Sequence, residues 1–304
     1  LMLALTCATA TGVRAQDNEK PYLTKNFPAA GLTNVVVQTS GGNVSVTGQP
    51  GEARIEVYIR GNNWKDQISR TDIEDRLRNY EITIDKNANT LTATAKPLNS
   101  SNWKNWNWND NGLSISFRIY VPANVDTKLQ TSGGNIKLSG LDGDQSVGTS
   151  GGNIGINGGK GLVKARTSGG NIDAERFNGS LDASTSGGNV KVDEASGTMK
   201  LTTSGGNIRL TQVRGSVEAR TSGGNVTADI TSLGKYLTLG TSGGSINVKM
   251  PLDQGMDLDL SGDRVSIAMQ NFKGTIEDDR VKGQLNGGGI PVRIATSGGN
   301  VRVN

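Results

Sequence analysis

Residues 131–140 read TSGGNIKLSG, and residues 149–158 read TSGGNIGING. The pentapeptide TSGGN starts again at Thr167, Thr185, Thr203 and Thr221, so that successive copies are evenly spaced by eighteen positions. A repeat of this length marks a structural unit that cannot bury its own apolar face and must stack on its neighbours. The sequence therefore predicts a stack of short β-coils, each one repeat period long.

The residues after each motif alternate between apolar and polar side chains, which is the pattern of a strand with one buried face. The sixth position of each coil is Ile or Val, and the eighth position is also apolar. A second strand ends each coil, as in Leu181 with Ala183 and Met199 with Leu201, while Asp182 is expected to face water. These columns predict an all-β, single-stranded parallel β-helix. The sixth-position residues are Ile136, Ile154, Ile172, Val190, Ile208 and Val226.

The glycines and asparagines of TSGGN predict a sharp corner between strands. Glycine allows either a positive φ or a close approach of backbone between coils. Asparagines one coil apart would lie about 4.8 Å from each other in a stacked sheet, close enough to form an amide ladder. We therefore interpret the motif as scaffold.

Three familiar repeat classes do not fit. Calcium-binding nonapeptide repeats need an aspartate column after their glycines, whereas Asn follows the glycine pair here. Hexapeptide helices place an aliphatic residue at every sixth position, and the apolar columns here fall at positions 6, 8, 11, 15 and 17. No Leu-x-x-Leu-x-Leu pattern recurs, so leucine-rich repeats are excluded as well.

The array is interrupted near its start. One early coil carries TSGGN at Thr39, and the next copy begins only at Thr131. We predict a signal peptide at 1–15, a first β-coil at 16–52, an inserted capping region at 53–121 and solenoid repeats at 122–304. Within the insertion, the patterns predict strands at 53–60 and 113–121, a helix at 66–80 and a hairpin at 80–95.

Beyond Thr241 the motif decays, with a worn copy at Ser261–Val265, before a full TSGGN returns at Thr296. The interval from Thr241 to Thr296 is close to three periods. It predicts about three further coils with one insertion or deletion. The strand Val301–Val303 is then expected to be an edge of the sheet.

Residues 1–15 run from apolar to small side chains and end on Val13-Arg14-Ala15, a pattern that signal peptidase cuts. We expect cleavage before Gln16 and export to the periplasm, the cell surface or the medium. Cys7 would leave with the signal peptide. The mature chain would then contain no cysteine and no transmembrane segment.

The segment from Ile119 to Gly143, IYVPANVDTKLQTSGGNIKLSGLDG, resembles the bacterial β-strand-repeat family of putative adhesins. Members share a Val-Pro-x-x-Val lead-in followed by Thr-Ser-x-Gly-x-Ile coils. The resemblance covers essentially the mature chain. It implies a right-handed parallel β-helix in an exported protein, and it carries no catalytic motif to particular residues.

The composition restricts the chemistry. Histidine is absent, which excludes imidazole-based mechanisms and most zinc sites. The net charge of +4 is small and dispersed, so we expect no nucleic-acid partner. Paired carboxylates remain candidates for polysaccharide cleavage, although we interpret them as solvated side chains. They are Asp142 with Asp144, Asp257 with Asp259, and Glu277 with Asp278 and Asp279.

The most unusual segment is 99–112, NSSNWKNWNWNDNG, which holds Trp103, Trp106 and Trp108. Indole rings stack on sugar rings, while side chains such as Asn105 and Asn107 bond hydroxyl groups. The segment therefore predicts a glycan or surface contact. The alternative, which we favour, is that the tryptophans plug the uncovered N-terminal end of the solenoid, with Trp64 completing a small aromatic core.

Taken as a whole, the sequence predicts a non-catalytic envelope or surface protein, either an adhesin or a structural and binding module. It needs no cofactor and no metal, and its expected partner is a glycan or a cell-surface protein. Two alternatives stay open. One is a polysaccharide lyase or hydrolase built on a β-helix, and the other is an envelope scaffolding or stress-response protein.

Overall fold

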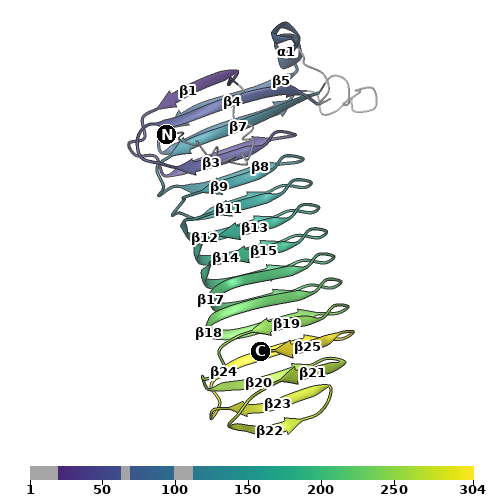
Figure 1. Ribbon diagram of the computed structural model, residues 1–304. Coiled ribbons are helices and arrows are strands. Elements are labelled where there is room, and N and C mark those ends of the chain that lie inside the picture. The colour runs from purple at the N-terminus through teal and green to yellow at the C-terminus, as the bar shows by residue number, and fades with distance from the viewer. Residues whose placement is uncertain (1–19, 63–68, 99–111) are drawn as a thin grey trace, which may run out of the picture.

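The chain forms an elongated stack of short strands that runs from an N-terminal cap to a C-terminal hairpin (Figure 1). Its structure is a computed structural model that describes residues 20–62, 69–98 and 112–304. Within these ranges lie 25 strands and one helix, and the strands are joined by hydrogen bonds into one continuous sheet. The all-β prediction is confirmed.

Each repeat coil contributes one strand to each of two walls. Wall A contains the strands that follow a TSGGN motif, and wall B contains those that precede one. The pairing is parallel and in register, so that Ile154 lies between Ile136 and Ile172. Wall A includes β9 (Ile136–Ser139), β11 (Ile154–Asn157), β13 (Ile172–Glu175) and β15 (Val190–Asp193); wall B includes β8 (Asp126–Thr131), β10 (Gln145–Gly148), β12 (Lys160–Arg166), β14 (Asn178–Ser184) and β16 (Ser196–Thr202); β17 (Ile208–Arg220) and β18 (Val226–Thr241) pass through both.

The predicted apolar columns fill the space between the walls. Ile154 and Ile172 from wall A are fully buried, and so are Leu181 and Ala183 from wall B. Complete burial of an aliphatic side chain of this size stabilises a fold by about 1.5–3 kcal/mol relative to an exposed one. Because each coil repeats the same inward positions, this burial drives one coil onto the next.

The TSGGN corner locks neighbouring coils together through buried polar groups. The hydroxyl of Thr149 donates to the Gly134 carbonyl of the preceding coil at 2.9 Å and accepts from the Gly152 N–H at 3.2 Å. A β-carbon on Gly152 would lie 2.0 Å from the Gly134 oxygen, so this glycine is required by close approach and not by a positive φ. The buried threonine hydroxyl is thereby satisfied within the stack.

At the N-terminal end the first coil is covered by longer strands. Its strands β2 (Asn34–Thr39) and β3 (Val44–Gly48) pair with β8 and β9 on one side and with β6 (Thr90–Pro97) and β7 (Leu113–Val121) on the other. The outermost strands are antiparallel: β5 (Tyr80–Asn87) on β6, and β4 (Ala53–Gly61) followed by β1 (Leu23–Phe27) on β7. We call these five outer strands, together with the helix described next, the cap.

The predicted helix and hairpin of the cap are both present. The helix α1 (Arg70–Leu77) is shorter than expected, and it begins with a capping box in which Ser69 and Asp72 each accept from the other's backbone N–H. None of its residues is buried, although Leu77 packs partly against the core. The hairpin β5–β6 turns at Ala88 and Asn89, as the sequence indicates.

The C-terminal end corrects one prediction. The last strand is no edge, because β25 (Asn300–Val303) lies between β19 (Ile246–Lys249) and β21 (Arg264–Ile267). In wall B, β24 (Ile290–Thr296) likewise lies between β18 and β20 (Met256–Ser261). In sequence order, β20, β21 and the hairpin of β22 (Phe272–Ile276) and β23 (Arg280–Leu285) come first. The chain then returns and places β24 and β25 between these strands and the rest of the array.

The return is possible because the last motif fits directly onto the motif at Thr241. The Thr296 hydroxyl donates to the Gly244 carbonyl at 2.7 Å, continuing the buried threonine column. The turn before β24 holds Asn286 and three glycines at positive φ, which lets the chain reverse tightly after β23. Coil β24–β25 is therefore an ordinary repeat placed out of sequence order.

Candidate functional site

The predicted contact residues Trp103, Trp106, Trp108, Asn105 and Asn107 lie outside the described residues, as does Trp64. The chain on either side of this segment is well fixed, however. The Leu113 N–H donates to the Tyr80 hydroxyl at 2.9 Å, and the Gly112 carbonyl accepts from the Asn62 N–H at 3.0 Å. The tryptophan segment therefore rejoins the cap at the start of β7, beside the end of β4.

The strands β4 and β7 carry an unusual set of side chains on their outer face. Their antiparallel register places Arg54 opposite Tyr120 and Glu56 opposite Arg118. Tyr58 follows on the same face of β4. Alternate residues of a strand point to the same face, and the inward alternates such as Ile55 and Phe117 are fully buried. We call Arg54, Glu56, Tyr58, Arg118 and Tyr120 the Arg–Tyr cluster.

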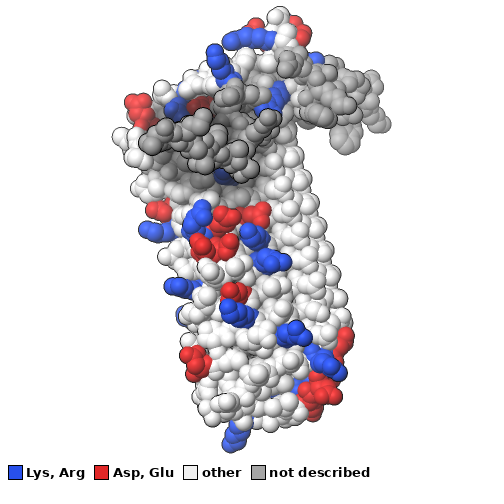
Figure 2. Space-filling model, in the orientation of Figure 1, with Lys and Arg blue, Asp and Glu red and all other residues white. Residues whose placement is uncertain are grey.

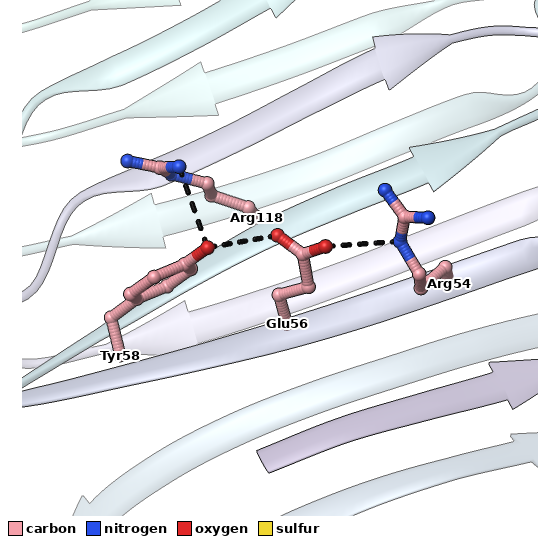
Figure 3. Close-up of polar contacts among 4 residues, drawn as sticks. All are labelled: Arg54, Glu56, Tyr58 and Arg118. Carbon is pink, nitrogen blue, oxygen red and sulfur yellow. Dashed lines mark hydrogen bonds and ion pairs between the residues drawn. The ribbon is translucent and has the colours of Figure 1, made fainter. Parts of the chain in front are cut away.

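The carboxylate of Glu56 organises this cluster (Figure 3). One oxygen accepts from the Tyr58 hydroxyl at 2.9 Å, and the other lies 3.0 Å from Nε of Arg54. That second contact is an ion pair without good hydrogen-bond alignment. The Arg118 guanidinium in turn donates to the Tyr58 hydroxyl at 3.4 Å. The result is a fixed chain of donors and acceptors across two strands.

Two guanidinium groups also stack on tyrosine rings. The guanidinium carbon of Arg54 lies 4.3 Å from the Tyr120 ring centroid, and that of Arg118 lies 4.5 Å from the Tyr58 centroid. Each such cation–π contact is worth about 0.5–1 kcal/mol at an exposed site. Each stacked pair joins one strand to the other, because Arg54 and Tyr58 belong to β4 and Tyr120 and Arg118 belong to β7.

Burial raises the pKa of the Tyr58 phenol above its ordinary value of 10.0, and the hydrogen bond to Glu56 raises that pKa further. The phenol therefore stays protonated at neutral pH. A protonated phenol is a poor nucleophile, and its one O–H already donates to Glu56 and so fixes the cluster. The cluster is thus equipped for holding a ligand more than for attacking one.

A cavity of about 190 Å³ opens next to the cluster. Hydroxyl, amide and guanidinium groups dominate its walls. Guanidinium groups bind carboxylates and other oxyanions well, and serine hydroxyls bond to oxygen in either direction. The cavity therefore suits a small, oxygen-rich group bearing negative charge. It is lined by Asn43, Ser45, Tyr58, Arg60, Ser114, Ser116, Phe117 and Arg118.

The cavity adjoins the place where the tryptophan segment rejoins the chain, since Ser114 follows Leu113 directly. Sequence reasoning did not find these residues. The available signal is that the outward positions of two strands, Arg-Glu-Tyr-Arg in 54–60 and Ser-Ser-Arg-Tyr in 114–120, are long or polar throughout. Only the pairing of β4 with β7 unites them, across about sixty positions of the chain.

The candidate carboxylates lie apart from this cavity and have structural contacts. Asp259 forms an ion pair with Arg280 at 3.2 Å, and Asp257 accepts from the Gly289 N–H at 3.3 Å. Asp144 accepts from the Leu162 N–H at 3.4 Å, while Asp142 is exposed. Glu277, Asp278 and Asp279 form the exposed turn between β22 and β23. Among the described residues, no group of three or more His, Cys, Asp or Glu side chains could hold a metal ion.

Comparison with known proteins identifies the fold. Residues 53–304 match the sequence profile of the family described as Toastrack DUF4097. A solved structure from Parabacteroides distasonis, described as a putative lipid binding protein, is similar with a TM-score of 0.55 and 15% identity, over 94% of this chain and 98% of that one. No curated protein matches the chain significantly.

Two further structures are described as putative adhesins. One, from Parabacteroides distasonis, has a TM-score of 0.47 and 11% identity over 92% of this chain and 96% of that one. The other, from Bacteroides fragilis, has a TM-score of 0.39 and 14% identity over 93% and 96%. Within the part of this chain that the structure describes, no helix is long and apolar enough to cross a membrane.

Proposed function

This chain belongs to the Toastrack DUF4097 family, and from that premise we propose that it is a non-catalytic binding module that holds an acidic sugar at its cap. The observation that carries the proposal is the cavity beside Tyr58 and Arg118. Its donors are held in place by Glu56 and by ring stacking before any ligand arrives. Such preorganisation lowers the entropic cost of binding.

The two parts of this site divide the work of recognition. The guanidinium and hydroxyl groups of the cavity bind the carboxylate of the sugar. Trp103, Trp106 and Trp108 stack on sugar rings, while Asn105 and Asn107 bond their hydroxyls. If the tryptophan segment instead plugs the end of the solenoid, the cavity still binds but the indoles contribute stability in place of affinity.

We also propose where the protein acts and how its chain is divided. Residues 1–15 serve as a signal peptide, and the mature chain acts in the periplasm, at the cell surface or outside the cell. Residues 16–52 form the first coil, 53–121 an inserted capping region and 122–304 the repeat array. The stack winds right-handed, and each coil takes up one eighteen-position repeat of the sequence.

Binding of a lipid inside the stack is a weaker candidate, even though a protein with this fold is described as a putative lipid binding protein. The space between the walls is occupied by the columns of buried Ile, Leu, Val and Thr side chains. Polysaccharide cleavage is also weaker, because the candidate carboxylates lie in turns or ion pairs. An enzyme would produce new reducing ends or unsaturated sugars from acidic polysaccharides, and we expect neither.

The test uses galacturonate, with galactose as the neutral control and binding followed by NMR titration. Arg118→Gln removes one of the two guanidinium charges that line the cavity and should weaken galacturonate binding roughly tenfold, since a charge-assisted hydrogen bond contributes about 1.5–3 kcal/mol. Arg293→Gln, an exposed arginine on wall B, is the matched control and should change nothing. Equal affinities for all three proteins would refute the proposal.

A second variant separates the two roles of the tryptophans. Replacing Trp103, Trp106 and Trp108 together by Ala should weaken binding while amide exchange at Leu113 and Tyr80 stays slow. Rapid exchange at both positions would show instead that the indoles are needed to hold the cap. An envelope scaffolding role would appear in the same preparations as a protein partner captured by crosslinking in cells.

A further inference from the structure

A shallow groove of about 490 Å³ runs along wall A beside the TSGGN corners, and its first asparagine, Asn171, lies three coils from Asn43 of the cap cavity. It crosses β13, β15, β17 and β18 and is lined mainly by polar side chains. Figure 2 shows charged side chains of both signs over this face of the stack, next to an edge that carries none along its middle part. The lining residues are Asn171, Asp173, Asn189, Val190, Lys191, Asn207, Ile208, Arg209, Asn225 and Thr227.

The asparagines of this groove are held in one orientation by the fold. The side-chain oxygen of Asn171 accepts from the backbone N–H of Asn189 at 2.8 Å, and that of Asn189 accepts from the N–H of Asn207 at the same distance. The pattern extends from Asn43 to Ser245 without interruption. It modifies the expected amide ladder, because the main contact runs from side chain to backbone.

This bonding fixes where the amide donors are. Since each oxygen is committed to the backbone of the next coil, the side-chain NH₂ groups lie on the opposite side of the amide. Two of them make a further contact within the described part of the chain, and both contacts are long, at 3.4 and 3.3 Å. Neighbouring coils are about 4.8 Å apart, so the four asparagines form a row of donors about 14 Å long.

The charges along the row favour an anion. Lys191 and Arg209 occupy the same position in successive coils, two residues after their asparagines, and Lys191 also forms an ion pair with Asp193 at 4.0 Å. Of the described residues, Asp173 is the one carboxylate that lines the groove. An ammonium, a guanidinium and a row of N–H donors all seek oxygen acceptors, and ionised acceptors bind them most strongly.

We propose that this groove is a binding track for an extended acidic polysaccharide, whose carboxylate and hydroxyl oxygens accept hydrogen bonds from the asparagine row as the chain lies along the stack. The track needs a ligand several sugars long, because its donors are spread over four coils. The cap cavity holds a single group. The two sites therefore differ in their dependence on chain length.

The chain itself supplies the test variant. At the next coil Ser245 replaces the asparagine, and its hydroxyl still accepts from the Asn300 N–H at 3.1 Å. Asn189→Ser with Asn207→Ser should accordingly keep the coils bonded while removing two of the four NH₂ donor groups from the groove. Asn135→Ser makes the same change in the same column but outside the groove, and it serves as the matched control.

Binding is measured by calorimetry with hexagalacturonate, with galacturonate monomer and a neutral dextran oligomer of six sugars for comparison. The double variant should bind hexagalacturonate roughly tenfold more weakly than the wild type, from the loss of hydrogen bonds to ionised acceptors. Asn135→Ser should match the wild type. Asp173→Asn should bind more tightly, because it removes the carboxylate from the groove.

Three results would each refute the proposed binding track. The first is an unchanged affinity for hexagalacturonate in the double variant with its fold intact, and the second is an equal affinity of the wild type for dextran. The third is a loss of hexagalacturonate affinity in Asn135→Ser as large as that in the double variant. The cap is judged separately, because Arg118→Gln should reduce monomer binding and leave the effect of the double variant on hexagalacturonate unchanged. Failure of one site therefore leaves the other site testable.

Discussion

At the N-terminal end, coil β2–β3 lies between the repeat array and strands β6 and β7, and at the C-terminal end coil β24–β25 lies between the array and β20–β21. Both ends thus hold a regular coil inside an outer layer that contains antiparallel strands. The outer layers differ in what they show to solvent. The cap displays the Arg–Tyr cluster, whereas the C-terminal hairpin leaves Ile276 65% exposed beside the acidic turn at 277–279.

This difference shows that covering the end of the stack and forming a binding site are two separate tasks. Both ends must satisfy the strand edges that an uncovered coil would expose. The hairpin β22–β23 meets that need with short strands and exposed charges. The cap adds helix α1 and two long strands, β4 and β7, and these two strands supply most of the residues that line the cavity. We therefore expect ligand binding at the cap, which contains more residues than are needed to cover the first coil.

The largest effect is expected from Ile294→Asp in the inserted strand β24. Ile294 is fully buried, so the substitution places an unpaired carboxylate in the core and should cost about 4 kcal/mol or more. Hydrogen exchange should become fast in β20 to β25 while β11 to β16 stay protected. Uniform exchange along the whole stack would show that the C-terminal end is not a separate cooperative unit.

A comparable loss at the other end is expected from Phe117→Ala. This side chain is fully buried beneath the cavity, and its removal should cost about 3–5 kcal/mol, measured by the exchange of amides in β4 and β7. Galacturonate binding should fall with it, because β4 and β7 carry most of the cavity's lining residues. If Phe117→Ala keeps full affinity for galacturonate, the cavity does not depend on the packing of the cap core.

A smaller effect is expected from Glu56→Gln, which neutralises the centre of the Arg–Tyr cluster. The pKa of Tyr58 should fall towards its ordinary value, because the raising contribution of the Glu56 charge is lost. In the wild type the raised pKa favours the folded cap below pH 10, and this contribution is lost as pH rises through the folded pKa. Spectroscopic titration of the phenol in both proteins checks the difference, with Tyr58→Phe as the blank.

Much of this architecture follows from the sequence, because each coil repeats the same local rule. The Ile column, the Thr-Ser-Gly corner and the strands of the insertion all appear where the pattern places them. The order of the last coils does not. The motif at Thr296 presents the same hydrogen-bonding groups as the other copies. The pattern therefore shows that these residues form a coil, but it does not show which coils lie next to it. The worn copy at Ser261–Val265 does form a corner, between β20 and β21, but beyond the final motif in space.

The Arg–Tyr cluster escaped prediction for a related reason. Its members lie on two strands whose outward residues have no repeat to align them, and antiparallel pairing is fixed by the tertiary fold. Glu56 and Arg118 look like ordinary solvated charges until β4 and β7 are placed side by side. The asparagine row is the converse case, since its residues were identified as scaffold and their fixed donors became apparent only from the bonding of each oxygen.

The position of coil β24–β25 also affects the order in which the strands pair during folding. Most coils pair with the coil one repeat away, as Ile154 does with Ile172, whereas β18 pairs with β24 across a segment about three times as long, from Leu237 to Val292. Closing a loop three times as long costs about 1 kcal/mol more entropy, and distant pairings form more slowly. The stack can therefore grow coil by coil as far as β19 while the chain is still emerging, but its final contacts wait until Val303 is free. Coil β24–β25 thus completes a layer that β20 and β21 have already begun.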